Sequence, residues 1–396
     1  MKARCKGLVT LFTFFVLLGF HSSPMAFQRS IEENQYALWN AVATRAVKEA
    51  RNLMGAPHPQ DAVVLTNAGY AVVEGLTTEP CLDGLRQWEG ATAGKRSLLE
   101  VHSARNSALW FFFFNRRTGQ GVYYELKGQN ISWIIGWLEY FRAPWIRRII
   151  AALPTDQLFG EPAYEENILA EHLLANQANK DAWNDKVAAK VFGGREFAIV
   201  TIANGIAHGT PYDLIKSVQF HDHYCPGVTS GYLLANYLEK NFPLLVPGSA
   251  YFVLSIPPWC KDDALQILLN TTPGKSGYAV FYLSAADKGN LREEAKDLAG
   301  VFFRKNQSGK WEGVVLGFSF AKIEEMGGPT TAQGYAWESR LAMDLWLLDY
   351  LDQPELFINV IKTFELQQGA PSDWARVGVD PLDAAHLDLW KPASTP

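Results

Sequence analysis

The amino-acid sequence predicts an α+β fold built from two tandem copies of one unit, because segments of its first half recur in its second half in the same order. Gly69–Cys81 matches Gly248–Cys260 without a gap, and each segment has the pattern of a strand that delivers a cysteine after a proline. Phe111–Gly121 resembles Val301–Lys310, a strand, a glycine turn and a return strand. Several matches in the same order are difficult to produce by chance.

Two further recurrences support the same duplication. Thr92–Lys95 resembles Thr272–Lys275 at the end of a predicted helix, and Trp137–Trp145 resembles Leu347–Glu355, a helix that ends before a proline. The matches divide the chain into a signal peptide at 1–26, a degenerate copy at 27–155, a helical connector with an added strand at 156–204, a second copy at 205–365 and a C-terminal tail at 366–396.

The connector is predicted to be helical over Pro162–Phe192 and a strand over Glu196–Ala207. The length of the chain without its first residues suits two domains of ordinary size.

The first residues have the pattern of a secretory signal peptide. Lys2, Arg4 and Lys6 precede the apolar stretch Gly7–Phe20, and small residues follow up to a predicted cleavage near Ala26. No later segment is long and apolar enough to span a bilayer. We therefore expect an exported, soluble mature chain, periplasmic or secreted, without a membrane span.

Charge and cysteine content narrow the function. The net charge of −5 comes with no basic tract, so we expect no nucleic-acid partner. Cys5 leaves with the signal peptide, and Cys81, Cys225 and Cys260 remain. An odd number of cysteines in an exported protein argues against a complete disulfide framework. One Cys225–Cys260 disulfide beside a buried free Cys81 remains the alternative to a metal site.

The segment Phe220–Gly227 gathers His221, His223 and Cys225, and Cys260 follows at the start of another predicted helix. Two imidazoles and two thiols are a sufficient donor set for a tetrahedral site that binds a soft metal ion. The matching part of the first copy, residues 30–36, contains neither His nor Cys. We therefore expect one metal ion per chain, held by the second copy alone.

The local sequence predicts how these donors are presented. His221 and His223 share a face only if the backbone is extended there, so we expect Val218–Phe220 to be an extended entry. Cys225 precedes a predicted helix, Val228–Lys240, with proline in an early position. A thiolate at a helix N-terminus is stabilised by the free amides, so we expect Cys225 to ionise easily.

Three residues near the donors are candidates for supporting roles: Asp263, Thr272 and Lys275. Asp263 can accept a hydrogen bond from a ligating imidazole, whereas Asp262 fits the simpler role of an acid in a helix's first turn. Thr272 and Lys275 either close the helix or place a hydroxyl and an ammonium at the rim of a metal pocket. His208 lies in a predicted glycine-bounded loop, where a lone histidine is more often neither a ligand nor a proton carrier.

These motifs resemble the FmdE-like family, which takes its name from formylmethanofuran dehydrogenase. The family pattern is Phe-His-Gly-His-x-Cys-Pro-Gly, then Cys-x-x-Asp-Ala-hydrophobic-Gln and Thr-x-Gly-Lys, matched here by Phe220–Gly227, Cys260–Gln266 and Thr272–Lys275. The resemblance implies an α+β domain with a mixed sheet, a tendency to dimerise, and a bound transition metal, with zinc as the simplest assumption. It assigns the ligand role to His221, His223, Cys225 and Cys260.

The chain departs from the family pattern at three places. Asp222 replaces the usual glycine and adds a carboxylate within reach of the metal or its ligands. Asn270–Thr271 replaces a more typical Gly-Cys. No Cys follows Cys260 in this sequence, so we expect no C-terminal zinc ribbon like that of many relatives. The dehydrogenase reaction itself belongs to other proteins of that enzyme, which carry molybdenum or tungsten pterins.

A tandem pair of such domains is expected to form an intrachain pseudo-dimer. We predict a pseudo-two-fold arrangement with a cleft whose floor is the metal site and whose wall comes from the first copy. Trp110 or Trp133 are candidates to line that wall.

Four functions are compatible with these residues. The favoured one is an exported protein that binds a transition metal or a metal-containing small ligand. A zinc enzyme would keep an open coordination position and use Asp222 or Asp263 as base. Alternatively, His221 or His223 could activate Cys225 as a nucleophile. In the last, His and Cys would be axial ligands to a tetrapyrrole in an aromatic pocket. Catalysis stays open.

Overall fold

The computed structural model describes residues 24–330, 336–384 and 389–391. The predicted signal peptide lies outside the described residues except for Pro24–Ala26, with which helix α1 (Pro24–Met54) begins. Among the described residues, none of the helices combines the length and the apolar character needed to cross a membrane.

The first unit is a five-stranded mixed sheet in the order β4-β1-β5-β6-β7. The edge pair β4 and β1 is parallel, and every other neighbouring pair is antiparallel. The strands are β1 (Ala62–Thr66), β4 (Leu98–Glu100), β5 (Trp110–Asn115), β6 (Gly121–Glu125) and β7 (Ala163–Glu165). The accompanying helices are α2 (Cys81–Leu85), η1 (Ala93–Lys95), α3 (Gly128–Gly136), η2 (Leu138–Tyr140), α4 (Ala143–Ala152) and α5 (Thr155–Phe159).

The second unit is also a five-stranded mixed sheet, in the order β9-β8-β10-β11-β12, and again only its edge pair is parallel. Its strands are β8 (Phe252–Ser255), β9 (Tyr278–Val280), β10 (Leu298–Lys305), β11 (Trp311–Phe318) and β12 (Ile358–Glu365). Its helices are α10 (Pro226–Asn241), α11 (Lys261–Leu268), η3 (Pro273–Lys275), α12 (Ala285–Asn290), η4 (Glu293–Ala295), α13 (Ala321–Glu325), α14 (Trp337–Leu347), η5 (Leu348–Tyr350) and η6 (Pro354–Leu356).

The two sheets therefore have the same strand order and the same strand directions, and each is preceded by a long helix. The predicted α+β class with mixed sheets is confirmed. The gapless match of Gly69–Cys81 with Gly248–Cys260 is wrong in detail. In the first unit β1 already ends at Thr66, and a small hairpin, β2 (Val72–Val73) with β3 (Leu76–Thr77), stands between it and Cys81.

The run of phenylalanines in β5 shows why this strand is central. Phe112 and Phe114 pack into the core beneath α8, whereas Phe111 and Phe113 pack against α1 and its neighbours. Successive side chains of a strand point to opposite faces, so an uninterrupted apolar run needs cover on both. The sheet of the first unit is accordingly buried between two helical layers.

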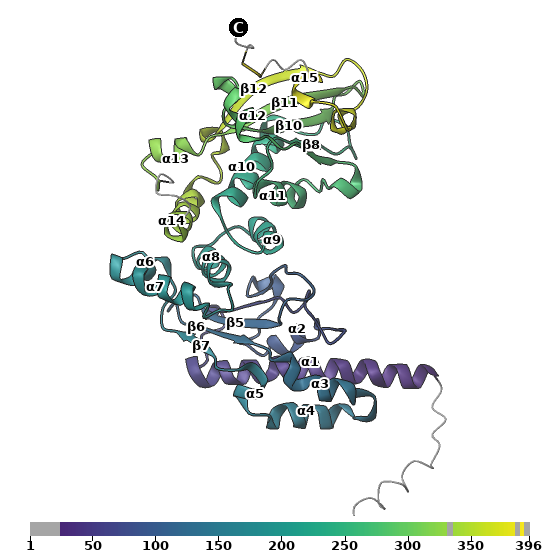
Figure 1. Ribbon diagram of the computed structural model, residues 1–396, viewed down its shortest axis with the longest axis vertical. Helices are drawn as coiled ribbons and strands as arrows, with labels where there is room; N and C mark the ends of the chain where they lie inside the picture. Colours follow the sequence, from purple (N-terminus) through teal and green to yellow (C-terminus); the bar gives the residue numbers. More distant parts are fainter. Residues whose placement is uncertain (1–23, 331–335, 385–388, 392–396) are drawn as a thin grey trace, which may run out of the picture.

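Four helices lie between the two sheets or beside them (Figure 1). They are α6 (Ala170–Leu173), α7 (Gln177–Ala189), α8 (Glu196–Ala207) and α9 (Tyr212–His221). The predicted strand Glu196–Ala207 is wrong, because this segment is the helix α8. Its branched residues, such as Ile199, Val200 and Ile202, are buried because α8 lies inside the core that joins the two units.

The units are stacked in the same sense, so the predicted pseudo-two-fold pair is wrong. The face of the first sheet that α1 and α2 cover points away from the second unit, with α1 as an outer layer (Figure 1). The face of the second sheet that α10 and α11 cover points toward the first unit. A two-fold axis would require both helical layers to face inward or both outward.

Two predicted boundaries also change. The strand β7 belongs to the first sheet although it lies in the predicted connector, so the first unit extends past residue 155. The predicted tail carries η7 (Pro371–Ala375) and α15 (Pro381–Ala384). Its residues Trp374, Leu382 and Leu389 are buried against the outer face of the second sheet. That face would otherwise expose Phe303 and Val315.

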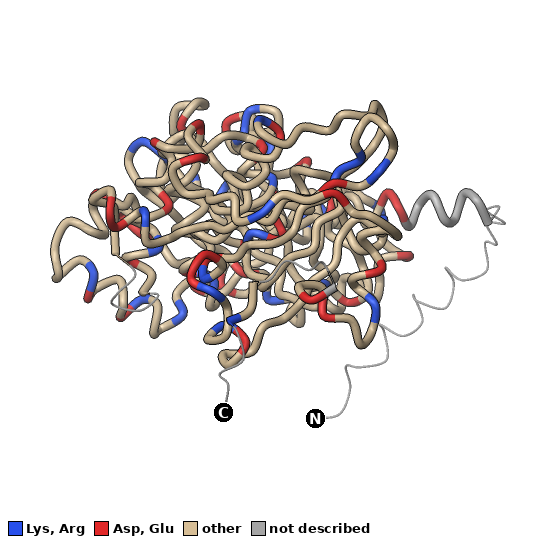
Figure 2. The backbone as a smooth tube through the Cα atoms, turned by 90° about the horizontal axis from the view of Figure 1, so that it is seen from above, with Lys and Arg blue, Asp and Glu red and all other residues tan. Residues whose placement is uncertain are grey.

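Charged residues are distributed over the whole molecule. Figure 2 shows acidic and basic positions intermixed along the described backbone. The arrangement agrees with the mildly acidic composition of the chain, whose net charge is −5.

Candidate metal centre

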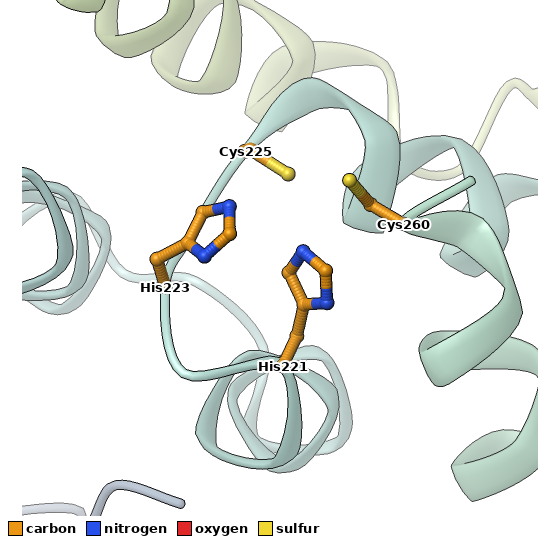
Figure 3. A group of neighbouring side chains, drawn as sticks. All are labelled: His221, His223, Cys225 and Cys260. Atoms are coloured by element: carbon orange, nitrogen blue, oxygen red, sulfur yellow. The ribbon is translucent and has the colours of Figure 1, made fainter. Parts of the chain in front are cut away.

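Three helix ends meet at the predicted metal site. His221 is the last residue of α9, Cys225 is the residue that caps the start of α10, and Cys260 caps the start of α11. One ligand atom from each of His221, His223, Cys225 and Cys260 lies within 4.8 Å of the others. Figure 3 shows the two rings and the two sulfur atoms turned toward a common centre.

The two histidines approach each other by a route that the sequence did not predict. Val218–Phe220 is the last turn of α9 and is not extended. Asp222 ends the helix in the left-handed conformation, with φ +68°, which aspartate tolerates better than most residues. This turn brings the two histidines together, with the ring centroids of His221 and His223 4.3 Å apart.

A carboxylate orients each imidazole. The Nδ1 of His221 lies 2.6 Å from Asp263 Oδ2, and the Nδ1 of His223 lies 2.8 Å from Asp222 Oδ1. When Nδ1–H donates to the carboxylate, Nε2 keeps its lone pair for a metal ion. The Nε2 of His221 is buried and has no hydrogen-bond partner, which is unusual for a polar atom unless something binds there.

The first unit holds the end of α9 from behind. The backbone amide of His102 donates to the carbonyl of Gln219 (2.9 Å), and the Gln219 side chain donates to the carbonyl of Glu100 (3.0 Å). The ring of Phe220 stacks on the ring of His102 at 5.4 Å. The first unit therefore contributes to the position of His221 without contributing a donor atom.

The two thiols of the site differ in acidity. The pKa of Cys260 is lowered to about 4 because the Cys225 thiol donates a hydrogen bond to its sulfur and because His221 and His223 lie beside it. The same hydrogen bond, together with burial, raises the pKa of Cys225. The prediction that Cys225 ionises easily is therefore wrong, since Cys260 carries the negative charge. Both cysteines are free thiols, and the structure contains no Cys225–Cys260 disulfide.

His221 carries the matching positive charge. Burial by itself lowers the pKa of His221, but the hydrogen bond to Asp263 and the neighbouring Cys260 outweigh it and raise the pKa to about 9. A metal ion that binds here must therefore displace protons from His221 and Cys225.

A buried ion pair in the first turn of α11 fixes the position of Cys260. The ammonium of Lys261 is fully buried and donates to Ser255 Oγ (2.7 Å), the carbonyl of Pro257 (2.9 Å) and Asp262 Oδ1 (2.8 Å). Asp262 also accepts from the hydroxyl of Tyr278 (2.6 Å). This network ties α11 to strands β8 and β9, and a buried lysine at this position has no signal in the sequence.

Close packing at the start of α10 requires glycine. A Cβ atom on Gly227 would lie 2.8 Å from the Cβ of Cys260 and 3.1 Å from its sulfur. A Cβ on Gly231 would lie 2.4 Å from the carbonyl oxygen of Lys261. The two glycines allow the starts of α10 and α11 to approach until their cysteines face each other.

The donor set fits a tetrahedral metal ion. With metal–sulfur bonds near 2.3 Å and metal–nitrogen bonds near 2.0 Å, the ligand atoms of a tetrahedron lie roughly 3.3–3.8 Å apart. The observed limit of 4.8 Å therefore requires only a small contraction, within the range of side-chain rotation. Among the described residues, this is the group of His, Cys, Asp and Glu side chains that is close enough to hold an ion.

A cavity of about 600 Å³ opens beside the site and is bounded in part by His223, Cys225 and Cys260. Its other walls are apolar side chains and four charged ones: Trp259, Leu283, Leu291, Leu298, Phe318, Phe320, Met343, Lys288, Lys296, Asp297 and Arg340. All of these belong to the second unit, so the predicted wall from the first copy is wrong. Trp110 is buried in the core, and Trp133 is exposed on the outer layer.

The remaining candidates lie away from the donors. Thr272 caps η3, and the ammonium of Lys275 donates to the side chain of Asn270; neither lines the cavity. His208 is the last capping residue of α8 and contacts Glu171 through Nε2 at 2.8 Å. Cys81 is buried and donates to the carbonyl of Trp39 at 3.2 Å.

Comparison with known protein families gives a match in the second unit. The family described as "FmdE, Molybdenum formylmethanofuran dehydrogenase operon" matches residues 220–332. The matched stretch begins at Phe220 and includes all four donors, α10, α11 and the strands β8 to β11. It supports the FmdE-like resemblance for the second unit. No curated protein matches the chain.

Proposed function

We propose that this protein is an exported FmdE-like protein that binds one transition metal ion through His221, His223, Cys225 and Cys260. The observation that carries the proposal is the convergence of these four side chains within 4.8 Å, with the buried Nε2 of His221 left without a partner. Zinc is the simplest ion for two nitrogen and two sulfur ligands, because it prefers a tetrahedral arrangement of such donors.

The adjoining cavity supports a second step in this function, the binding of a small ligand beside the metal. Three of the four donors border a space of about 600 Å³, which is the size of a small-molecule site. A tetrapyrrole is less well supported, because axial ligation uses one or two protein atoms, whereas four donors converge here.

A zinc enzyme with an open coordination position is the second candidate, favoured by the same cavity. A base would have to come from a residue other than Asp222 or Asp263, because both accept hydrogen bonds from the imidazoles. Those contacts support a role in orienting the histidines. The count of protein ligands on the metal separates this candidate from a closed binding site.

Tandem duplication and export complete the proposal. Duplication is supported by the common strand order and strand directions of the two sheets and by the recurring segments of the sequence. Export to the periplasm or the medium is supported by the basic and apolar residues up to Ala26.

The test is elemental analysis of the exported protein beside two variants. We expect one zinc ion per chain in the wild-type protein and in Cys81→Ala, because Cys81 is buried in the first unit. The double variant Cys225→Ala with Cys260→Ala should retain no stoichiometric metal. Two ions per wild-type chain, or metal retained by the double variant, would reject the proposal.

A further inference from the structure

The hairpin of α3 and α4 exposes aromatic side chains on the outside of the first unit. Its inner side packs beneath α1 through buried aliphatic residues: Ile131, Ile134, Leu138, Ile146 and Ile150. Its outer side carries Trp133, Trp137, Tyr140 and Trp145, which are between 48% and 69% exposed. We name these four residues the aromatic patch. Four large rings exposed within such a short segment mark a surface that something covers.

The aromatic patch stands on a rigid support. The buried side chain of Asn34 donates to the carbonyls of Leu138 (2.9 Å) and Phe141 (2.7 Å), which pins the turn between the two helices to α1. The rings of Trp137 and Tyr140 contact each other with centroids 5.4 Å apart. The exposed rings therefore belong to an ordered helical surface.

Basic residues are interleaved with the aromatic patch. Arg142, Arg147 and Arg148 are exposed in the same hairpin, and Arg148 lies over the ring of Trp145 at 5.5 Å. No ion pair found among the described residues involves these three arginines. The acidic residue of the hairpin is Glu139, which lies in the sequence between α3 and Arg142. Residues 128–152 hold these three arginines and one glutamate as their charged side chains, a net charge of +2 in a chain whose net charge is −5.

The corresponding segment of the second unit uses its aromatic residues differently. Trp346 and Tyr350 are only partly exposed, and their rings contact each other at 4.2 Å and also contact Phe357. In that unit the aromatic residues contribute to the core. In the first unit the core is already closed by isoleucine and leucine, so stability alone does not account for the aromatic patch.

The position of the hairpin restricts what can cover it. Helices α1, α3 and α4 form the outermost layer at the end of the molecule opposite the second sheet (Figure 1). The metal site lies on the other side of the first sheet, so a partner at the aromatic patch leaves the cavity accessible. The apolar stretch Gly7–Phe20 precedes α1 in the sequence, and α1 belongs to this same layer.

We propose that the aromatic patch docks the protein on a lipid bilayer that contains anionic headgroups. Tryptophan and tyrosine favour the boundary between headgroups and acyl chains, because their rings are apolar and their N–H and O–H groups bind water. Arginines beside them are attracted to anionic lipid. An amphipathic helical surface with both features lies in the plane of a membrane interface. The proposal is independent of the metal site.

Flotation of the mature chain, from residue 27, with lipid vesicles tests the proposal. We expect binding to vesicles of phosphatidylcholine with one quarter phosphatidylglycerol, weakened by salt. The variant Trp137→Ser, Tyr140→Ser, Trp145→Ser should bind at least about tenfold more weakly. The variant Arg142→Gln, Arg147→Gln, Arg148→Gln should lose about 100-fold on the anionic vesicles, at roughly fivefold per arginine, and should be unchanged on pure phosphatidylcholine.

Tyr282→Ser is the matched control, because Tyr282 is an exposed ring of the second unit and should leave vesicle binding unchanged. Far-ultraviolet circular dichroism of every variant checks that the fold is kept. The proposal fails if the wild-type chain does not float with anionic vesicles or if the aromatic variant binds as well as the wild type. It also fails if the patch instead mediates self-association, seen as a dimer in sedimentation equilibrium that the aromatic variant abolishes.

Discussion

The two units share a strand order, and in each a short helix that follows a cysteine packs against a longer helix: α2 against α1, and α11 against α10. The units differ at this contact. In the first unit, Cys81 at the start of α2 faces the middle of the continuous helix α1 and is sealed against Trp39. In the second unit, Cys260 faces a break between α9 and α10, and the turn in that break carries His223. A cysteine that faces the middle of a helix can only pack against it. A cysteine that faces a turn between two helices can lie beside further donor side chains.

A second difference concerns the helical layer of each unit, which is covered by the other unit in one case and exposed in the other. The second unit has its helical layer inside the molecule, so its donors are supported from behind by Glu100 and His102 of the first unit. The first unit has its helical layer outside, where the aromatic patch is exposed. Stacking in the same sense therefore gives the two units different surroundings and separates a buried chemical site from an exposed surface.

The largest expected contrast is between the thiols of Cys260 and Cys81 in metal-free protein. Because the pKa of Cys260 is about 4, its thiolate is almost fully formed at pH 6, and this state is lost only as the pH falls through 4. Burial raises the pKa of Cys81 well above its usual value, so its thiolate fraction at pH 6 is more than about 1000-fold smaller.

Alkylation with iodoacetamide at pH 6, followed by peptide mass spectrometry, measures this contrast. Cys260 should be modified while Cys81 stays unmodified, and all three cysteines of the mature chain should react once the protein is unfolded. Equal rates for Cys81 and Cys260 in the folded protein would show that the two positions are chemically alike.

The buried ion pair is a feature of the second unit alone at this position, since Leu82 follows Cys81 where Lys261 follows Cys260. Lys261→Met leaves Asp262 buried beside Tyr278 without its cation, and breaking such a pair costs about 3–5 kcal/mol in unfolding free energy. Urea unfolding measures the loss.

Two controls accompany this variant. Lys275→Met removes an exposed ammonium and should change the unfolding free energy by less than about 0.5 kcal/mol. Adding Asp262→Asn to Lys261→Met should recover part of the loss, because the buried charge is removed. A Lys261→Met protein as stable as the wild type would contradict the role given to this network.

The smallest expected effect concerns the carboxylates that orient the histidines. Asp263→Asn should weaken metal affinity by about 10- to 100-fold, the usual loss when the partner of a ligating imidazole is removed. Asp222→Asn should cost less, because the Asp222 side chain is 61% exposed and water can replace it. Competition with a coloured chelator measures both, and a larger loss for Asp222→Asn would reverse the assignment.

The composition of the metal site could be predicted from the sequence because its four donors are concentrated in two short motifs. Its geometry could not, because the αL turn at Asp222 and the glycine contact between Gly227 and Cys260 depend on how three helices meet. The branched residues of Glu196–Ala207 favour a strand, and burial between two layers overrides that preference.

The way the two units stack could not be predicted from the sequence for a similar reason. Matching hydrophobic patterns indicate that two segments adopt one fold, but they do not say which face of each sheet meets the other unit. That choice depends on α8 and α9, which have no counterpart in the recurring segments. The buried state of Lys261 likewise follows from the tertiary packing around Trp259, over whose ring the ammonium lies at 3.7 Å.

X-ray absorption at the zinc edge of the exported protein identifies directly which atoms coordinate the metal ion. We predict one ion per chain with two sulfur ligands near 2.3 Å and two nitrogen ligands near 2.0 Å. Cys260→Ala should reduce the sulfur ligands from two to one or lose the metal altogether, and Cys81→Ala should leave the spectrum unchanged. A first coordination sphere of oxygen and nitrogen without sulfur would contradict metal binding by Cys225 and Cys260.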